Sequence, residues 1–227
     1  MTPTAELRSI QVGKPQTLGT DKPWTSGFLK ETVAEPLWLG TTNLAGDGQA
    51  DLEHHGGPHK AVCVYSAEHY PYWRDQLQLP ELKAGDFGEN FTIGELTEHD
   101  VCIGDTWSIG EAVVQVSQPR QPCWKLARRW DIKTLALQVQ QTGYTGWYFR
   151  VLQEGQVQQG NPARLVDRQW PQWTIEAANQ LMHHDKKNMT AAKDLMAVPS
   201  LSPSWQATLA KRVTKGKEPD TAKRLEG

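Results

Sequence analysis

Glycine, proline and Asn/Asp residues divide the chain, up to about residue 168, into many short segments. The runs between these breaks, such as 113–117 (VVQVS) and 146–152 (GWYFRVL), are rich in β-branched and aromatic residues, which favour strands. Short strands at this spacing are typical of an antiparallel barrel or sandwich and not of alternating β-α-β units. The sequence therefore predicts a mixed, mainly β fold, with a β-barrel or sandwich as its body.

Two turns are predicted from local signals. Residues 153–156 (QEGQ) have the composition of a hairpin turn, so the run before them is expected to pair with a return strand at 163–166. Residues 108–111 (SIGE) are expected to form another tight turn.

Two helices are predicted to interrupt the strands. Ser66 is a suitable N-cap for a helix that continues to Leu77. A second helical pattern follows Cys123 and ends at Gly143, with a break near Asp131.

The composition changes after about residue 169. Three short helices are predicted there, over 174–184, over 187–197, and from the Ser202-Pro203 N-cap through Val213. At 227 residues the chain has room for about one and a half domains. We therefore expect a β-rich domain over 1–168, a three-helix domain over 169–216, and a flexible charged tail over 217–227.

Charge and cysteine content exclude several classes of protein. The 24 Lys and Arg residues are balanced by 26 Asp and Glu residues, so a nucleic-acid polymer is not an expected partner. The N-terminus lacks a signal-peptide pattern and no apolar run approaches the ~18 residues that span a bilayer, which predicts a cytoplasmic protein without a membrane partner.

Three cysteines without a CxxC pair give neither a disulfide framework nor an all-cysteine iron–sulfur cluster. No dinucleotide or phosphate-loop fingerprint is present, so neither an intrinsic flavin nor NAD is expected.

The first stretch that could carry chemistry is 54–63 (HHGGPHKAVC). Its imidazoles and Cys63 could suggest zinc, but Gly-Gly-Pro prevents the continuous helix that would align such ligands. A tight glycine loop whose backbone N–H groups, together with His55 and Lys60, hold an anion is the better interpretation. Cys63 then belongs to a buried strand and is predicted to be a core residue.

Two further stretches could contribute to a site. In 85–91 (GDFGENF), the Glu-Asn pair could face a ligand, or it could only stabilise a turn. In 117–125 (SQPRQPCWK), a strand ends and Cys123 stands where a helix should begin, next to Arg120 and Lys125. These surroundings favour the thiolate of a reactive or metal-ligating cysteine, although a half-buried structural thiol is the alternative.

Taken together, the stretches 55–62, 87–91, 117–126 and 145–148 resemble the MOSC family, the molybdenum-cofactor sulfurase C-terminal type, and in particular its YiiM-like branch. The resemblance implies a MOSC β-barrel over 1–168 and a 3-alpha domain over 169–216. It also implies that the chain binds the molybdenum cofactor (molybdopterin), with Cys123 as the catalytic residue and molybdenum ligand. The residues expected to hold the cofactor are His55, Lys60, Asn90, Arg120 and Lys125. His59 departs from the family, whose members often have aspartate at this position, and its role stays open.

Members of this branch reduce N-hydroxylated compounds, so the implied substrates are hydroxylamines and N-hydroxylaminopurine-type bases. Because the chain has no electron carrier of its own, an external flavin-containing reductase is the expected donor. The alternative is that Cys123 carries sulfur as a persulfide, or passes on the cofactor, without turnover of an organic substrate. Pyridoxal phosphate is a further ligand that the resemblance suggests.

Overall fold

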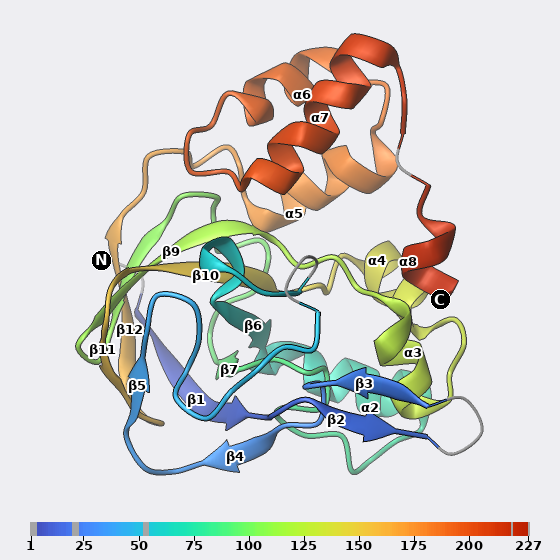
Figure 1. The fold of residues 1–227 in the computed structure, drawn as a ribbon. Coiled ribbons are helices and arrows are strands. Elements are labelled where there is room, and N and C mark those ends of the chain that lie inside the picture. The colour runs from blue at the N-terminus through green and yellow to red at the C-terminus, as the bar shows by residue number, and fades with distance from the viewer. Residues whose placement is uncertain (1–3, 20–22, 52–54, 219, 227) are drawn as a thin grey trace.

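A closed barrel of seven strands forms the body of the protein (Figure 1). The computed structural model describes residues 4–19, 23–51, 55–218 and 220–226. The strands follow one another around the barrel in the order β12-β8-β9-β10-β6-β7-β1, and β1 pairs with β12 to close it. All neighbouring barrel strands are antiparallel except β6 and β7, which are parallel. Their bounds are β1 Thr4–Val12, β6 Val62–Ser66, β7 Phe91–Ile93, β8 Thr106–Ile109, β9 Ala112–Pro119, β10 Trp147–Gln153 and β12 Pro162–Asp167.

Short strands decorate the barrel. β4 (Glu31–Val33) pairs with the far end of β1, and β2 (Gln16–Leu18) forms a small ribbon with β3 (Trp24–Ser26). β5 (Leu37–Leu39) pairs with β11 (Gly155–Val157). The predicted mixed, mainly β fold with a barrel body is therefore confirmed.

The hairpin predicted after 146–152 is wrong. β10 pairs with β9 along most of its length and with β6 at Trp147–Phe149, and it does not pair with the chain that follows it. β11 pairs instead with β5, and β12 pairs with β8 and β1. The other predicted turn is confirmed: Ile109 lies opposite Ala112, and Gly110 takes the positive φ of 57° that this tight turn requires.

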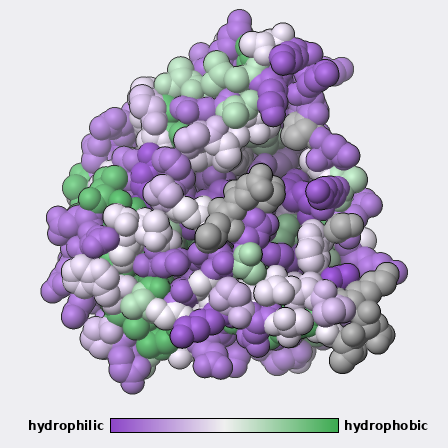
Figure 2. Space-filling model, viewed as in Figure 1, coloured by the Kyte–Doolittle hydropathy of each residue, from purple (hydrophilic) through white to green (hydrophobic). Residues whose placement is uncertain are grey.

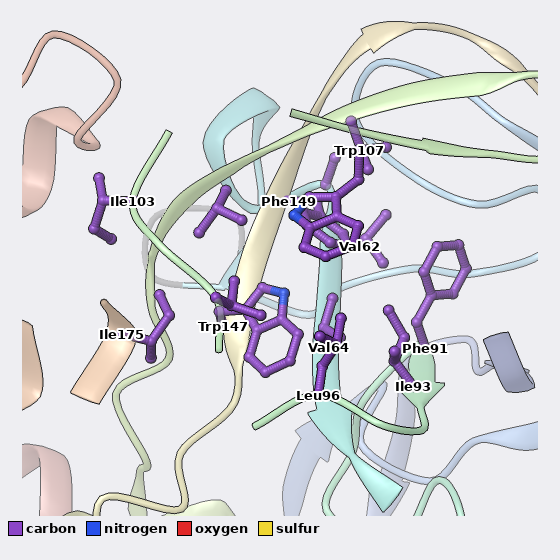
Figure 3. Packing of buried hydrophobic residues seen from close by; sticks show 14 of the residues in the cluster. Val62, Val64, Phe91, Ile93, Leu96, Ile103, Trp107, Trp147, Phe149 and Ile175 are labelled. Carbon is purple, nitrogen blue, oxygen red and sulfur yellow. The ribbon is translucent and has the colours of Figure 1, made fainter. Parts of the chain in front are cut away.

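The core fills the barrel and continues outside its wall. Inside, fully buried side chains from β6, β8 and β10 pack together, among them Val62, Val64, Trp107 and Phe149 (Figure 3). A second buried cluster packs outside β6 and contains Tyr65, Trp73, Phe87 and Leu126. Because β6 is covered on both faces, all five of its residues are buried.

Helices cover the outer face at their predicted positions. The Ser66 hydroxyl accepts a hydrogen bond from the Glu68 N–H at 3.2 Å and caps a short 3-10 turn that leads into α2 (Tyr70–Leu77). α3 (Trp124–Trp130) ends where Asp131 adopts the left-handed conformation. α4 (Leu135–Thr142) ends at Gly143, which also has a positive φ.

The C-terminal helices pack together at one end of the barrel (Figure 1). α5 (Ile175–Asn179) continues as a π-helical segment (Gln180–His184), and α6 (Met189–Met196) and α7 (Pro203–Lys215) follow. Thr174 and Ser202 cap α5 and α7 through their side-chain oxygens. Part of the predicted flexible tail differs from expectation, because it forms a further helix, α8 (Ala222–Glu226), which lies beside α3.

Candidate functional site

All six residues that the sequence singles out for the site line one pocket, here called the inner pocket, of about 80 Å³. It lies where the loop after β9 meets the loop before β7 and the segment before β6. The six lining residues are His55, Lys60, Asn90, Arg120, Cys123 and Lys125. Of the 54–63 stretch that suggested it, His54 lies outside the described residues.

The inner pocket is built for a negatively charged group. Its lining contains four basic side chains, Lys30, Lys60, Arg120 and Lys125, and no carboxylate among the described residues. Arg120 is only 6% exposed, and one guanidinium nitrogen, Nη2, donates to the Phe87 carbonyl at 2.5 Å. Its Nη1 is buried without a hydrogen-bond partner. A buried, charged N–H group is costly to leave unpaired, so this atom indicates that an anionic ligand belongs in the pocket.

Asn90 lines the pocket, but its polar atoms bond to the protein. Its Oδ1 accepts from the Cys63 N–H at 3.1 Å, and its Nδ2 donates to Asp47 at 2.9 Å and to the Gln11 carbonyl at 3.2 Å. Asp47 in turn pairs with Lys30. Asn90 therefore holds the wall of the pocket together through bonds to distant parts of the chain, and not within a local turn, and its role toward a ligand stays a prediction.

Glu89, the other half of the Glu-Asn pair, does not line the pocket. Its carboxylate is buried and accepts from the hydroxyls of Tyr70 and Thr92 and from the Gly85 N–H. The neighbouring Gly88 is required by close packing: a Cβ atom there would lie 2.7 Å from the ring of Phe28.

Cys123 occupies the N-cap position of α3, as predicted, with an extended backbone (φ −129°, ψ 166°). It is a free cysteine of intermediate exposure, whereas Cys63 and Cys102 are buried. Cys63 is a buried residue of β6, as predicted. It also lines the inner pocket, because side chains alternate along β6 and its neighbours Val62 and Val64 take the barrel interior.

Tyr148 and Lys30 are among the pocket residues that were missed from sequence. Tyr148 on β10 is 8% exposed and lines the pocket beside Cys63; burial and the neighbouring Cys63 raise its pKa, so its hydroxyl keeps its proton. It stands within a family-like stretch, 145–148, which was a signal that could have found it. Lys30 comes from an irregular segment before β4, where no local pattern marks it.

Burial lowers the pKa of two residues that were predicted to bind an anion, His55 and Lys60. Burial and then the nearby Lys125 lower the pKa of His55 to about 4, although Asp51 opposes this shift. Its imidazole is therefore neutral near pH 7 and offers a hydrogen bond and not a charge. Burial lowers the pKa of Lys60 as well, with Asp51 again opposing.

His59 lines neither this pocket nor the cavity next to it. Its backbone carbonyl accepts from the Ser117 hydroxyl at 2.6 Å, and burial followed by the charge of Arg150 lowers the pKa of its imidazole. The zinc alternative gains no support: within the described residues, no three His, Cys, Asp or Glu side chains come together as a set of metal ligands.

A second cavity, here called the outer chamber, opens next to the inner pocket and has a volume of about 630 Å³. Cys123 and Tyr148 line both spaces, as do His55, Lys60, Gln121 and Lys125. The other walls of the outer chamber come from Trp24 and Trp124, from α7 through Ser204 and Thr208, and from the segment containing α8. Cys123 thus stands at the junction of a small cationic pocket and a larger chamber of the size that holds organic ligands.

One face of the molecule is mainly hydrophilic. Figure 2 shows mostly hydrophilic side chains on the viewed face, with hydrophobic side chains in small areas near its margins. In the described part of the chain, no helix has the length and apolar character needed to cross a bilayer.

Two family models match the chain. The MOSC domain model matches residues 51–164, and the model of the YiiM-like, 3-alpha helix domain matches residues 173–216. The first range contains the described inner-pocket residues His55, Lys60, Arg120 and Cys123, and the second contains α5 to α7.

Individual relatives agree with these matches. Protein YiiM of Escherichia coli is 38% identical over 220 residues, which are 96% of this chain and 97% of that protein. A reductase of Gibberella moniliformis is 35% identical over 172 residues, 74% of this chain but only 30% of that longer protein. The crystal structure of YiiM from Geobacillus stearothermophilus superposes with a TM-score of 0.80 at 40% identity, covering 93% of this chain and all of that one. The chain therefore belongs to the MOSC family and, with its 3-alpha C-terminal region, to the YiiM-like branch of that family.

Proposed function

We propose that the protein is a molybdenum-cofactor-dependent reductase of N-hydroxylated compounds. The observation that carries this proposal is the position of Cys123, whose side chain lines both a cationic pocket and a chamber large enough for an organic substrate. Membership of the MOSC family and the similarity to a protein named reductase support oxidoreductase chemistry. The net reaction is R–NHOH plus two electrons and two protons, giving R–NH2 and water.

The residues of the inner pocket fit the cofactor. Its phosphate requires a cationic, hydrogen-bonding cradle, and the unpaired Nη1 of Arg120 together with Lys60 and Lys125 offers one. A single thiolate from Cys123 suits a metal that receives its other sulfur ligands from the cofactor itself. When bound, the cofactor supplies the two-electron redox chemistry.

The residues of the chain bind and orient the cofactor and the substrate. Cys123 anchors the metal, Arg120 and Lys60 orient the anionic end, and the neutral imidazole of His55 donates or accepts one hydrogen bond. Tyr148 keeps its hydroxyl proton and faces the junction, so it can donate a hydrogen bond to the oxygen that leaves the substrate. The substrate enters through the outer chamber, where the indoles of Trp24 and Trp124, whose centroids lie 5.6 Å apart, offer aromatic surface to a flat base. An external flavin-containing reductase supplies the electrons.

The test uses protein loaded with the cofactor and a chemical electron donor, reduced methyl viologen. Wild type should retain molybdenum through desalting and reduce N-hydroxylaminopurine. Cys123→Ala should lose molybdenum and at least about 100-fold in rate, because the metal loses its protein ligand. Cys102→Ala is the matched control, since Cys102 is buried away from both cavities and bonds to the Pro171 carbonyl.

The second candidate, a persulfide or cofactor carrier, is favoured by the free and partly exposed thiol of Cys123. Mass spectrometry of the protein separates the two. An extra sulfur on the peptide that contains Cys123, with no substrate-dependent reoxidation of loaded protein, would favour the carrier and end the reductase proposal.

A further inference from the structure

The end of the chain folds back onto the loop that carries Cys123. Arg224 of α8 donates from Nη1 to the carbonyl oxygen of Pro122, the residue directly before Cys123. Its Nη2 donates to Oε1 of Gln140, on α4, at 2.5 Å. One guanidinium therefore bridges the Cys123 loop and a helix of the body. Figure 1 shows α8 separated from the other C-terminal helices and placed beside α3 and α4.

The segment that leads to α8 is fixed at its start as well. Arg212 on α7 is 1% exposed and holds the Glu218 carboxylate through Nε at 2.5 Å and through Nη2 at 2.8 Å. The same guanidinium donates to the carbonyls of Leu181 and Met182, so it is anchored in the helical region. Glu218 and Arg224 thus attach the segment at two separate points.

The placement of Arg224 is specific. Its side chain is half-buried, and two of its nitrogens are bonded to acceptors on different elements. The planar fork of arginine meets two acceptors at fixed angles in a way that a lysine ammonium does not. Arg224 and Cys123 also both line the outer chamber.

From these contacts we propose that Arg224 is a positioning residue for Cys123, and that α8 is a structural part of the candidate active site. Holding the Pro122 carbonyl fixes the peptide that precedes Cys123 and so fixes the direction of its side chain at the start of α3. The proposal deepens the proposed function, because it concerns the residue assigned there as the metal ligand.

Hydrogen–deuterium exchange of the cofactor-free protein tests this directly. In Arg224→Ala, amides at the start of α3, including the Leu126 N–H that donates to the Cys123 carbonyl at 3.0 Å, should exchange at least about fivefold faster than in wild type. Arg224→Lys should recover only part of the protection. Lys217→Ala is the matched control, because it removes an exposed positive charge from the same segment and should leave this exchange unchanged.

A second variant tests the other attachment of this segment, the bond between Arg212 and Glu218. Glu218→Gln weakens the bond to Arg212 and should speed exchange at the start of α3 by a smaller factor than Arg224→Ala. Amides of β9 and β10 serve as the internal reference for global stability. Unchanged exchange at the start of α3 in Arg224→Ala, or an equal increase throughout the barrel, would overturn the proposal.

The outcome is separable from that of the proposed function. Faster local exchange in Arg224→Ala together with an inactive wild type would support the positioning role and reject the reductase. In an active wild type, Arg224→Ala should lower kcat about tenfold with KM changed less than twofold, as expected when a reacting group is misdirected. A change confined to KM would contradict positioning.

Discussion

Two loops border the inner pocket, and they use their polar residues in opposite ways. In the loop before β7, the amide of Asn90, which lines the pocket, is bonded to the protein through both of its polar atoms, while Glu89 lies outside the pocket, is bonded through Oε1 and leaves Oε2 buried without a partner. In the loop after β9, Arg120 leaves a buried nitrogen unpaired and Cys123 leaves its thiol free. Both loops have the same kind of composition, with glycine or proline around polar side chains. The comparison teaches that bonding to the protein, and not composition, separates a loop that builds a site from one that acts in it.

Replacing Arg120 should produce the largest effect. Arg120→Gln removes the charge and the unpaired donor, and the loss of charge-assisted hydrogen bonds predicts about 100-fold weaker retention of the cofactor. Molybdenum per chain after serial desalting measures it, with Lys125→Ala as a milder comparison. If Arg120→Gln retained as much molybdenum as wild type, the loop after β9 would not bind the cofactor through Arg120, and the difference between the two loops would be wrong.

Replacing Asn90 should instead affect the fold. Asn90→Ala leaves the Cys63 N–H without its buried partner and removes one of the hydrogen bonds to the Asp47 carboxylate, which stays paired with Lys30, so the free energy of unfolding should fall by about 2 kcal/mol. Denaturant unfolding measures this loss, and molybdenum retained per folded chain should change less than threefold. Gln138→Ala, which removes an exposed bond to Thr134, is the control and should change stability by only a few tenths of a kcal/mol. If Asn90→Ala lost molybdenum at unchanged stability, Asn90 would hold the cofactor directly, as the loop after β9 is proposed to do.

The smallest expected effect is the contribution of His55 to the pH dependence of stability. His55 lies in the inner pocket among basic side chains. Its pKa is about 4 in the folded protein and near 6.5 when unfolded, so the unfolded chain binds more protons between these values. Stability that is present above pH 6.5 should therefore fall as the pH drops towards 4, by about 1 kcal/mol between pH 7.5 and pH 5.8.

The readout is the difference between wild type and His55→Gln across this pH range. His55→Gln should lose less stability than wild type on acidification. His183→Gln gives a useful comparison, because burial, followed by Arg224, lowers the pKa of His183 to about 3, and His183 does not line the inner pocket. Parallel curves for wild type and His55→Gln would mean that the imidazole is not held neutral.

Local signals were sufficient for much of the fold. Ser66, Ser202 and Gly143 each mark a helix end through a bond or a φ angle that depends on a few neighbouring residues, and all three predictions are confirmed. The six site residues that the family-like stretches predicted also line one pocket, and their individual roles stay predictions.

The features that were missed depend on distant parts of the chain. The partner of β10 is decided by which strands occupy its edges, so the turn after it misled the prediction of a hairpin. The placement of Cys63 depends on which face of β6 meets the pocket, and both faces are buried. α8 has little apolar surface, and its attachment through Arg224 to a carbonyl some 100 residues earlier leaves no local trace.

The closure of the barrel has a consequence for handling the protein in pieces. β1 pairs with both β7 and β12, yet it lies before residue 51, where the match to the MOSC domain model begins. A fragment cut to the matched range would leave β7 and β12 as open edges with unpaired N–H and C=O groups. Such edges recruit strands from other molecules, so the fragment should self-associate instead of binding ligands. A fragment that keeps the barrel closed must therefore include β1, Thr4–Val12.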